Sequence, residues 1–380
     1  MATLRFVSAG AAQGLVGSVA RAQQQPVEGS FGAVGAMLEK LRAGEPCDVV
    51  ILTHAQIAAL TGEGAVVPGT AADLGEVATS IAVRAADPAP RVDDAQSLRA
   101  ALLAADAIYF PDPAKATAGI HFAKVLDSLG VRDSAAARVR NFPNGATSMR
   151  EMAAAQGHPI GCTQATEILA TPGIRLVAAL PRGLELDTVY TAAVNAHAAD
   201  RSAARAFVAR LTGAASRETR SNAGFRGYAI RPATAEDAAP IRALVRAVLD
   251  EYGLAPDPSG IDRDLEDPVA SYAGHGGQLD AVIDEPGRLV GCCGVMRHED
   301  GSCELRKMYL AKDARGRGLG RRLLDRALAF ARGSGFPRIE LETASVLDTA
   351  IAMYEAAGFR ALERPPSACR CDRAYAMDLA

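Results

Sequence analysis

The chain has 380 residues, of which 49% are hydrophobic and 22% are charged, and these proportions are typical of a globular protein. Its length predicts two or three domains. The formal net charge of −3 at pH 7 provides no general attraction to nucleic acid, and the lack of an uncharged apolar run of about 18 residues excludes a membrane-spanning helix.

The first residues do not have the pattern of an export signal. Residues 6–20 are mildly apolar, but they contain three glycines and Gln13 where a signal core is rich in leucine. Residues 3–8 have the pattern of a first β-strand, and the removal of this strand with a signal peptide would damage the fold. We therefore predict a cytoplasmic protein. The seven cysteines are scattered and odd in number, which argues against a disulfide framework. Neither the Cys369-x-Cys371 pair nor the histidines have the spacing of a metal site, so no metal is expected.

The first part of the chain alternates short apolar strands with helices, a pattern that favours an α/β fold with parallel sheets. Residues 212–227 contain Gly, Ser, Arg and Asn without an apolar period, so we place a domain boundary near residue 226. Strands are predicted at 4–7, 49–52, 80–83, 107–110, 160–163 and 176–180, and helices at 34–42, 55–60, 97–104, 120–129, 148–155 and 201–211.

The second part contains a strand, a glycine-rich turn and a helix in direct succession. It begins with the end of a strand at Ile230-Arg231-Pro232 and continues with a helix through Leu249, whose start at Thr234 to Asp237 has the pattern of a capping box. The predicted strand 303–310 then leads into the turn at 315–320, and residues 321–332 continue as an amphipathic helix. This order directs free backbone N–H groups and the positive end of the helix dipole at one point, which favours a bound phosphate. The turn alone would also fit a plain tight connection.

The residues that follow make the pattern more specific. A strand is predicted at 339–343, and a helix at 349–357 ends in Gly358-Phe359. With the motif Arg315-x-x-Gly318-x-Gly320, and with Ala350 and Tyr354, the chain over about residues 227–380 resembles the GNAT family of acetyl-CoA-dependent N-acetyltransferases. The resemblance implies a mixed β-sheet with flanking helices, acetyl-CoA as the cofactor, and direct attack of a primary amine on the thioester.

The same resemblance implies which residues hold the cofactor. The backbone amides from Arg317 through Arg321 would bind the pyrophosphate, and Arg315 and Arg317 would add positive charge. The strand at 308–310 would separate from 341–343 and pair with the pantetheine arm. Leu347 departs from the family, because many relatives have a polar residue there, and this weakens one cofactor contact. The expected cofactor-binding residues are Met308, Tyr309, Leu310, Arg315, Gly316, Arg317, Gly318, Leu319, Gly320 and Arg321.

The proton-transfer residues follow from the resemblance as well. Tyr354 matches the general acid of the family, and the ordinary pKa of tyrosine, near 10, suits a thiolate leaving group; ring packing on the core is the alternative. Glu304 is favoured as the general base, reached through water, and Glu342 is the other candidate. Either glutamate could instead be a solvated strand residue or hold the amine. The segment 251–277 would form a loop over the amine site, and its acids either attract a cationic amine or form a solvated face. These acids are Asp257, Asp262, Asp264, Glu266 and Asp267.

The first part of the chain has a resemblance of its own. Residues 4–10, 29–36 and 47–52, followed by Asp112-Pro113 and by Ile160-Gly161 with Gln164 and Glu167, occur in the order seen in molybdate-binding-protein-like solute-binding proteins. The resemblance implies a two-lobed type II periplasmic-binding fold over residues 1–226, with lobes at about 1–80 plus 185–226 and at 81–184, followed by an acetyltransferase domain at 227–380.

Two lobes of this kind would clamp a small anion between strand-to-helix turns. Ala33 and Val34 stand where molybdate binders usually have serines, so a carboxylate or another small anion is at least as well suited as molybdate. A cleft that has lost its ligand is the alternative. The expected ligand-binding residues are Ser8, Ala33, Val34, Thr117, Gly119, Thr163 and Gln164.

Taken together, these features predict an N-acetyltransferase with a small-anion-binding domain that regulates it, because lobe closure moves a rigid body. One alternative is a cytoplasmic or exported binding protein for a molybdate-like or carboxylate ligand, with a secondary or inactive acetyltransferase domain. Another is a fusion of two uncoupled activities. The expected partners are a small-molecule or peptide amine and a small anion, without nucleic acid or a membrane span, and a homodimer is left open.

Overall fold

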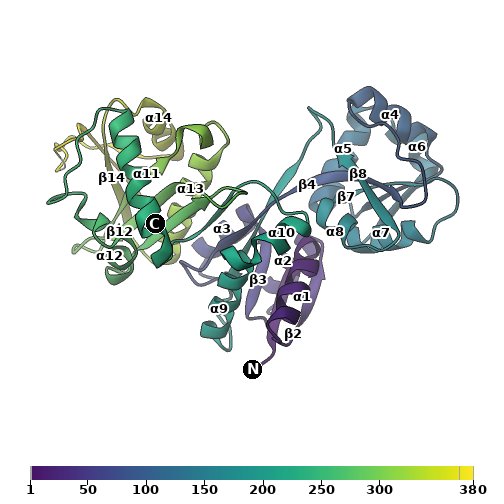
Figure 1. The fold of residues 1–380 in the computed structure, drawn as a ribbon, viewed down its shortest axis with the longest axis horizontal. Coiled ribbons are helices and arrows are strands. Elements are labelled where there is room, and N and C mark those ends of the chain that lie inside the picture. The colour runs from purple at the N-terminus through teal and green to yellow at the C-terminus, as the bar shows by residue number, and fades with distance from the viewer. Residues whose placement is uncertain (1, 368, 380) are drawn as a thin grey trace. The chain divides into compact units, whose positions relative to one another are not determined.

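The computed structural model describes residues 2–367 and 369–379 (Figure 1). The chain forms two compact units. Unit 1 comprises Met1–Ile57 and Asp73–Gly227, and unit 2 comprises Ala58–Ala72 and Tyr228–Ala380. A short segment from the first half of the sequence therefore belongs to the same unit as the C-terminal part.

The first lobe of unit 1 is built on a sheet with the strand order β2-β1-β3-β9. β1 (Leu4–Ala9) is parallel to β2 (Val27–Gly32) and to β3 (Val49–Thr53), whereas β9 (Asp187–Val194) is antiparallel to β3. Residues 49–52 are completely buried, as expected for a central strand covered on both faces. The helices are η1 (Gly10–Ala12), α1 (Gln13–Ala22), α2 (Val34–Arg42), α9 (Arg201–Thr212), η3 (Ala214–Ser216) and α10 (Arg217–Asn222), and α3 (His54–Gly62) continues into unit 2.

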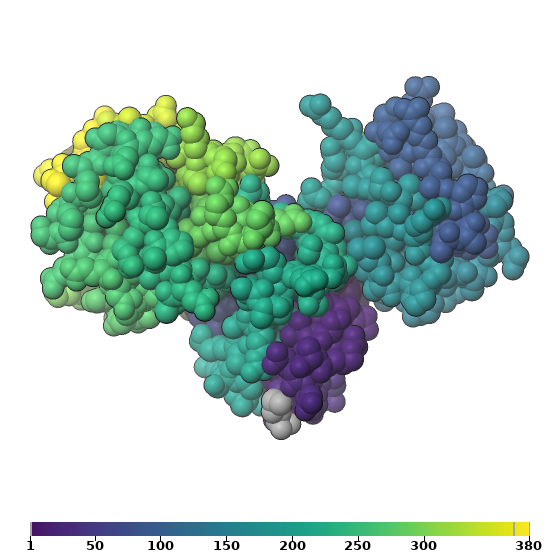
Figure 2. Space-filling view, viewed as in Figure 1, coloured from purple at the N-terminus to yellow at the C-terminus, as the bar shows by residue number. Residues whose placement is uncertain are grey.

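The second lobe is built around β4 (Ala72–Arg84), which pairs in antiparallel fashion with β7 (Ile160–Gln164) and β8 (Ile174–Ala179). β5 (Ile108–Pro111) lies parallel to β6 (Val139–Phe142) and to β7. In the space-filling view, the purple residues of the first lobe and the blue to teal residues of the second form two distinct masses (Figure 2). The helices are α4 (Ala95–Ala104), α5 (Thr117–Ser128), α6 (Arg132–Ala135), η2 (Ala136–Arg138), α7 (Gly145–Ala153) and α8 (Ala165–Leu169).

The sheets of unit 1 are mixed, which corrects the expectation of parallel sheets. The difference arises at β4 and β9, which carry the chain from one lobe to the other and back and run antiparallel to their neighbours. The sequence pattern also missed β2, β6 and β9. β2 is partly exposed and β6 is a short strand at the end of the strand order, whereas β9 is mostly buried.

Unit 2 contains a sheet with the strand order β10-β11-β12-β13-β14-β16-β15. Neighbouring strands are antiparallel except for β13 and β14, which are parallel. The strands are β10 (Ala229–Pro232), β11 (Gln278–Ile283), β12 (Leu289–Arg297), β13 (Cys303–Leu310), β14 (Arg338–Thr343), β15 (Arg360–Ala361) and β16 (Arg373–Asp378). The helices are η4 (Ala235–Asp237), α11 (Ala238–Glu251), η5 (Arg263–Leu265), α12 (Pro268–Gly274), η6 (Lys312–Ala314), α13 (Leu319–Gly333) and α14 (Asp348–Ala357).

α13 has the apolar periodicity of a helix that packs on a sheet. Its residues Leu323, Leu324, Ala327 and Ala331 are buried against the apolar face of β12 to β14. The segment expected as a loop at 251–277 is only partly irregular, because it includes η5 and α12. Within the described residues, no helix has the length and apolarity needed to cross a bilayer.

One charged side chain of α13 is buried within unit 2. Arg326 donates two hydrogen bonds to the carboxylate of Asp280 on β11, at 2.7 and 3.0 Å, and a third to the carbonyl of Ala71. Both charged side chains are about one-twentieth exposed (4% and 5%). Arg326 therefore connects the helix, the sheet and the segment Ala58–Ala72.

We expect Arg326→Met to lower the free energy of unfolding of unit 2 by about 3 kcal/mol, because it leaves the Asp280 carboxylate buried without its cation. Urea denaturation of the full chain measures the change. Adding Asp280→Asn to the variant should restore part of the loss. The matched control is Arg338→Met, whose ion pairs are partly exposed and should contribute less than about 1 kcal/mol. An Arg326→Met variant as stable as the control would contradict this account.

Candidate active site

The turn between β13 and α13 exposes backbone donors at the start of a long helix. Gly316 and Gly318 have φ values of 73° and 75°, a conformation that glycine adopts without the penalty of a Cβ atom. Gly318 is the N-cap of the 15-residue α13 and offers no side chain to its N–H groups. The N–H groups of the first turn, from Leu319 to Arg321, have no acceptor within the helix. This end of the helix therefore favours an anion.

The arginines of the turn differ in their surroundings. Arg315 is held by Glu251, at 2.9 and 2.8 Å, and its guanidinium lies 5.4 Å from the centre of the Tyr252 ring. Arg317 lies over the ring of Tyr228, and Arg321 pairs with Asp325 at 2.8 Å. Arg315 thus fixes the turn to α11, while Arg317 and Arg321 remain exposed.

β13 and β14 separate to form a gap in the sheet. Among the described residues, their parallel pairing is confined to Cys303 with Ile339 and Glu304 with Glu340. On its other side, β13 bulges against β12: Lys307 has a φ of 51°, and the register shifts between Cys292 and Gly294. A bulge redirects side chains and bends the strand. The backbone of β13 beyond Glu304 therefore faces the gap.

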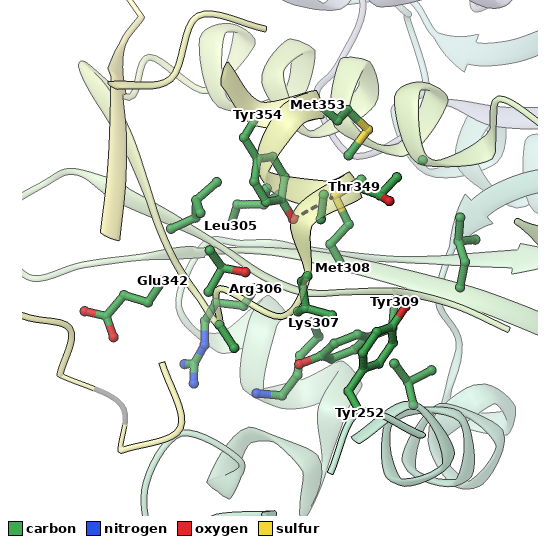
Figure 3. Close-up of a pocket in the computed structure, with 18 of the residues that line it drawn as sticks. Tyr252, Leu305, Arg306, Lys307, Met308, Tyr309, Glu342, Thr349, Met353 and Tyr354 are labelled. Atoms are coloured by element: carbon green, nitrogen blue, oxygen red, sulfur yellow. Dashed lines mark hydrogen bonds between the residues drawn. The ribbon is translucent and has the colours of Figure 1, made fainter. Parts of the chain in front are cut away.

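A cavity of about 410 Å³ occupies this gap, a volume that suits a small-molecule site (Figure 3). It reaches from the glycine turn to the residues near Glu304. Of the residues expected from the sequence to bind the cofactor or transfer protons, Arg317 and Leu319 do not line it. Those that do are Glu304, Met308, Tyr309, Leu310, Arg315, Gly316, Gly318, Gly320, Arg321, Glu342 and Tyr354.

Tyr354 is positioned on α14 with its hydroxyl directed at the gap (Figure 3). The hydroxyl donates to the sulfur of Met308 at 3.7 Å, and the ring packs against that of Phe359. The side chain is 6% exposed. Burial raises the pKa of Tyr354 above its ordinary value. The phenol is therefore in its protonated form at neutral pH.

The two candidate glutamates have different partners. Glu304 lies 3.2 Å from the Nε2 atom of His298 and 3.6 Å from Arg306. Hydrogen bonding to Glu304 raises the pKa of His298, although partial burial opposes it. Glu342 accepts hydrogen bonds from Arg364, at 3.0 Å, and from the backbone N–H of Ser367, at 2.8 Å. Glu342 is thus more fully engaged in holding the C-terminal segment.

A buried ionic cluster closes the side of the cavity that is lined by Ile261, Lys307 and Arg370. Lys307 lies 3.1 Å from Asp262 and 3.2 Å from Asp264, and Arg370 binds the Asp262 carboxylate through both of its terminal nitrogens. Tyr272 donates to Asp264 at 2.8 Å. Two of the acids expected to attract a cationic amine are therefore already neutralised by side chains of the chain itself.

The ionic cluster contains residues that the sequence did not single out. Lys307, Arg370, Arg306 and Ile261 all line the cavity. The left-handed conformation of Lys307 has no sequence signature, and Arg370 meets Asp262 only in the folded chain. The only sequence signal for this cluster was the presence of a basic residue on the strand, Lys307, and of a loop rich in acidic residues.

The lobes of unit 1 enclose a second, much smaller cavity of about 20 Å³. Of the residues predicted to bind a ligand, Ala33, Val34, Thr117, Thr163 and Gln164 line it. Ser8 and Gly119 do not: the Ser8 hydroxyl bonds to the Ala9 carbonyl, and Gly119 packs on the carbonyls of Pro111 and Asp112. The cavity also includes residues that were not among the expected ligand-binding residues, namely Gly10, Gly145, Glu167 and Tyr190.

Comparisons with known proteins match both parts of the chain. Residues 7–226 match the family described as bacterial extracellular solute-binding protein, and residues 244–359 match the acetyltransferase (GNAT) family. An uncharacterized N-acetyltransferase of Escherichia coli, YjgM, is 35% identical over 139 residues, which are 35% of this chain and 83% of that protein. Aconitate isomerase of a Pseudomonas species is 26% identical over 219 residues, 55% of this chain and 82% of that protein.

Among solved structures, the periplasmic molybdate-binding protein of Azotobacter vinelandii is 19% identical, with a TM-score of 0.47 over 58% of this chain and 98% of that chain. The first family model covers more than half of the present chain, and the relative from Escherichia coli is matched over most of its length. The chain therefore belongs to the bacterial extracellular solute-binding protein family and carries, in its C-terminal part, an N-acetyltransferase domain of the GNAT family.

Proposed function

We propose that the chain transfers the acetyl group of acetyl-CoA to a primary amine, by direct attack of the amine on the thioester, and that a small anion bound in unit 1 regulates this transfer. The observation that carries the proposal is the single cavity shared by the glycine turn, the gap between β13 and β14, and the Tyr354 hydroxyl. A phosphate, an extended arm and a proton donor would each find a place along it.

The residues of the turn fit the cofactor of the family, acetyl-CoA. The backbone N–H groups at the start of α13 would hold its pyrophosphate, with Arg317 and Arg321 adding positive charge nearby. The unpaired edge of β13 from Met308 to Leu310 would bind the amide groups of its pantetheine arm. When bound, the cofactor supplies a thioester, whose carbonyl carbon is open to a neutral amine.

The chain's own residues would manage two protons. A neutral amine is needed for attack, so Glu304 accepts the proton of the amine through water. Tyr354 donates its proton to the departing thiolate. Because burial raises the pKa of Tyr354, the phenol keeps this proton until the thiolate forms. Glu304 is preferred over Glu342 because the carboxylate of Glu342 is held by Arg364 and Ser367.

The first prediction from the proposed function concerns the anion site at the turn. Gly318→Glu places a carboxylate where the pyrophosphate would bind, so we expect acetyl-CoA affinity, measured by calorimetry on the full chain, to fall by more than about 100-fold. The control is Gly335→Glu near the other end of α13, because Gly335 has the same φ of 75° and equally open space around a Cβ atom. It should bind acetyl-CoA as the wild type does. If the wild type does not bind acetyl-CoA, the alternative is favoured that the chain is a small-ligand-binding protein with an inactive acetyltransferase domain.

The second prediction concerns the general acid. Tyr354→Phe should lower kcat by about 100-fold for the best acceptor of an amine panel while acetyl-CoA affinity is unchanged. Since burial raises the Tyr354 pKa above its ordinary value, the wild-type kcat should not decline between about pH 8 and pH 10 through loss of this proton. Tyr375→Phe is the control, because Tyr375 is equally buried but bonds to Glu355 outside the cavity. A Tyr354→Phe variant within twofold of the wild type would rule out this role.

A carboxylate is the better candidate for the anion in unit 1. The relative named aconitate isomerase aligns with this part of the chain, and Ala33 and Val34 offer no hydroxyls to an oxyanion. The proposed location is the cytoplasm, where acetyl-CoA is available to the fused domain.

Regulation has physical support in the segment Ala58–Ala72. This segment belongs to unit 2, where Arg326 of α13 binds the Ala71 carbonyl and a Cβ atom on Gly333 would lie 2.1 Å from the Thr61 carbonyl. The next residues of the chain form β4, the long strand of the second lobe. A lobe movement that displaces β4 would therefore act directly on α13, whose first turn is the proposed pyrophosphate site.

The third prediction tests this coupling. Saturation of unit 1 with trans-aconitate should change kcat/KM for acetyl-CoA by about fivefold or more, the usual size of a coupling between sites. Steady-state kinetics with and without the tricarboxylate measure the change, and calorimetry verifies that it is bound. Unchanged kinetic constants with the ligand bound would show that the two activities are independent.

A further inference from the structure

The N-terminal cleft already contains a negatively charged side chain at the place where an anion would bind. Glu167 of α8 is 7% exposed, and its Oε2 atom accepts a hydrogen bond from the Thr163 hydroxyl at 2.6 Å. The backbone N–H groups of Ala146, Gln164 and Gly145 also interact with its carboxyl group. The donors at the start of α7 are therefore taken by the chain's own carboxylate and are not free for an oxyanion.

Two glycines hold the carboxyl group between the lobes. A Cβ atom at Gly145 would lie 1.9 Å from Oε2 of Glu167, and one at Gly10, in the other lobe, would lie 2.8 Å from Oε1. Any larger residue at these positions would displace Glu167. The surrounding cavity of about 20 Å³ has room for little more than one water, so a ligand enters only when the lobes part.

The cavity also contains an acceptor without a donor. Gln164 is 3% exposed, and its Oε1 atom has no hydrogen-bond partner among residues 2–367 and 369–379. A buried polar atom in this state costs free energy unless a ligand satisfies it. Among the described residues that line the cavity, none is a lysine or arginine. The first N–H groups of α2, at Val34, and of α5, at Thr117, are the donors on the remaining sides.

These features point to the class of ligand. An oxyanion group that brings no proton would meet the Glu167 carboxylate at short range without a cation to offset the repulsion. A carboxylic acid that brings one proton would instead bind the α2 and α5 donors with one oxygen and bridge to Glu167 with the other. Two carboxyl groups that share one proton are a stable arrangement in proteins.

We propose that Glu167 determines the specificity of the N-terminal cleft: it admits a small carboxylic acid that shares one proton with it, and it excludes tetrahedral dianions such as sulfate and molybdate. This inference rests on the proposed function of unit 1 as an anion-binding domain. Burial raises the pKa of Glu167 despite the lowering effect of its hydrogen bonds, which makes the proton available at a higher pH than usual. The titratable group that faces Glu167 from a different element is Tyr190 of β9, which is itself buried.

The test is calorimetry on the full-length wild type with trans-aconitate, citrate, succinate, sulfate and molybdate. For a carboxylate probe, we expect uptake of about one proton at pH 7, measured in two buffers of different ionisation enthalpy, and an affinity that rises about tenfold for each pH unit lowered. Sulfate and molybdate should not bind. This measurement requires no variant, so a folding defect cannot obscure it.

Two variants extend the test. Glu167→Gln provides a neutral donor in place of the shared proton, so it should bind the carboxylate without proton uptake and should gain affinity for sulfate or molybdate. Glu151→Gln, on the exposed face of α7, should behave as the wild type does. Carboxylate binding without proton uptake, or tighter binding of molybdate by the wild type, would overturn the inference and leave the binding function intact. Absence of binding by every probe would overturn both.

Discussion

The separation of β13 from β14 after Glu304 is the constraint on which the C-terminal unit depends. Two adjacent parallel strands that stop pairing leave backbone N–H and C=O groups without partners, and such groups are costly when buried. The sheet remains intact because β13 pairs with β12 on one side and β14 pairs with β16 on the other. The open edge is therefore stable, and its backbone groups are available to hydrogen-bond with an extended ligand. The turn, the bulge and Tyr354 all border it.

Most of the charged side chains around this gap form ion pairs with one another. Lys307 is turned by the bulge toward Asp262 and Asp264, and Arg370 completes the set. A buried ionic cluster gains little stability over apolar packing, but it fixes the relative positions of the segments that carry it. Here it fixes the segment 257–267 and the C-terminal segment against β13. This side of the cavity is thus bounded by a wall whose charges are already paired.

The sequence was sufficient for features that are local in the chain. The glycine turn, the following helix and Tyr354 lie within one stretch of motif, and their places in the structure follow from backbone conformation and helix periodicity. The features it could not provide depend on distant residues. Arg370 binds Asp262, which lies 108 residues earlier in the sequence. The φ of Lys307 is set by the register of β12 and β13. Glu167 formed part of the motif that revealed the fold, but only the approach of α7 and of Gly10 shows that its carboxyl group occupies the cleft.

The assignment of Ala58–Ala72 to unit 2 also bears on how the chain is made. During synthesis this segment leaves the ribosome long before α13 exists, at a time when its neighbours in sequence are forming the first lobe. Domains usually fold as units from the N-terminus onward. Here the segment Ala58–Ala72 is synthesised with unit 1 but packs with unit 2. Fragments cut at the sequence boundary near residue 226 would therefore separate Ala58–Ala72 from the rest of unit 2.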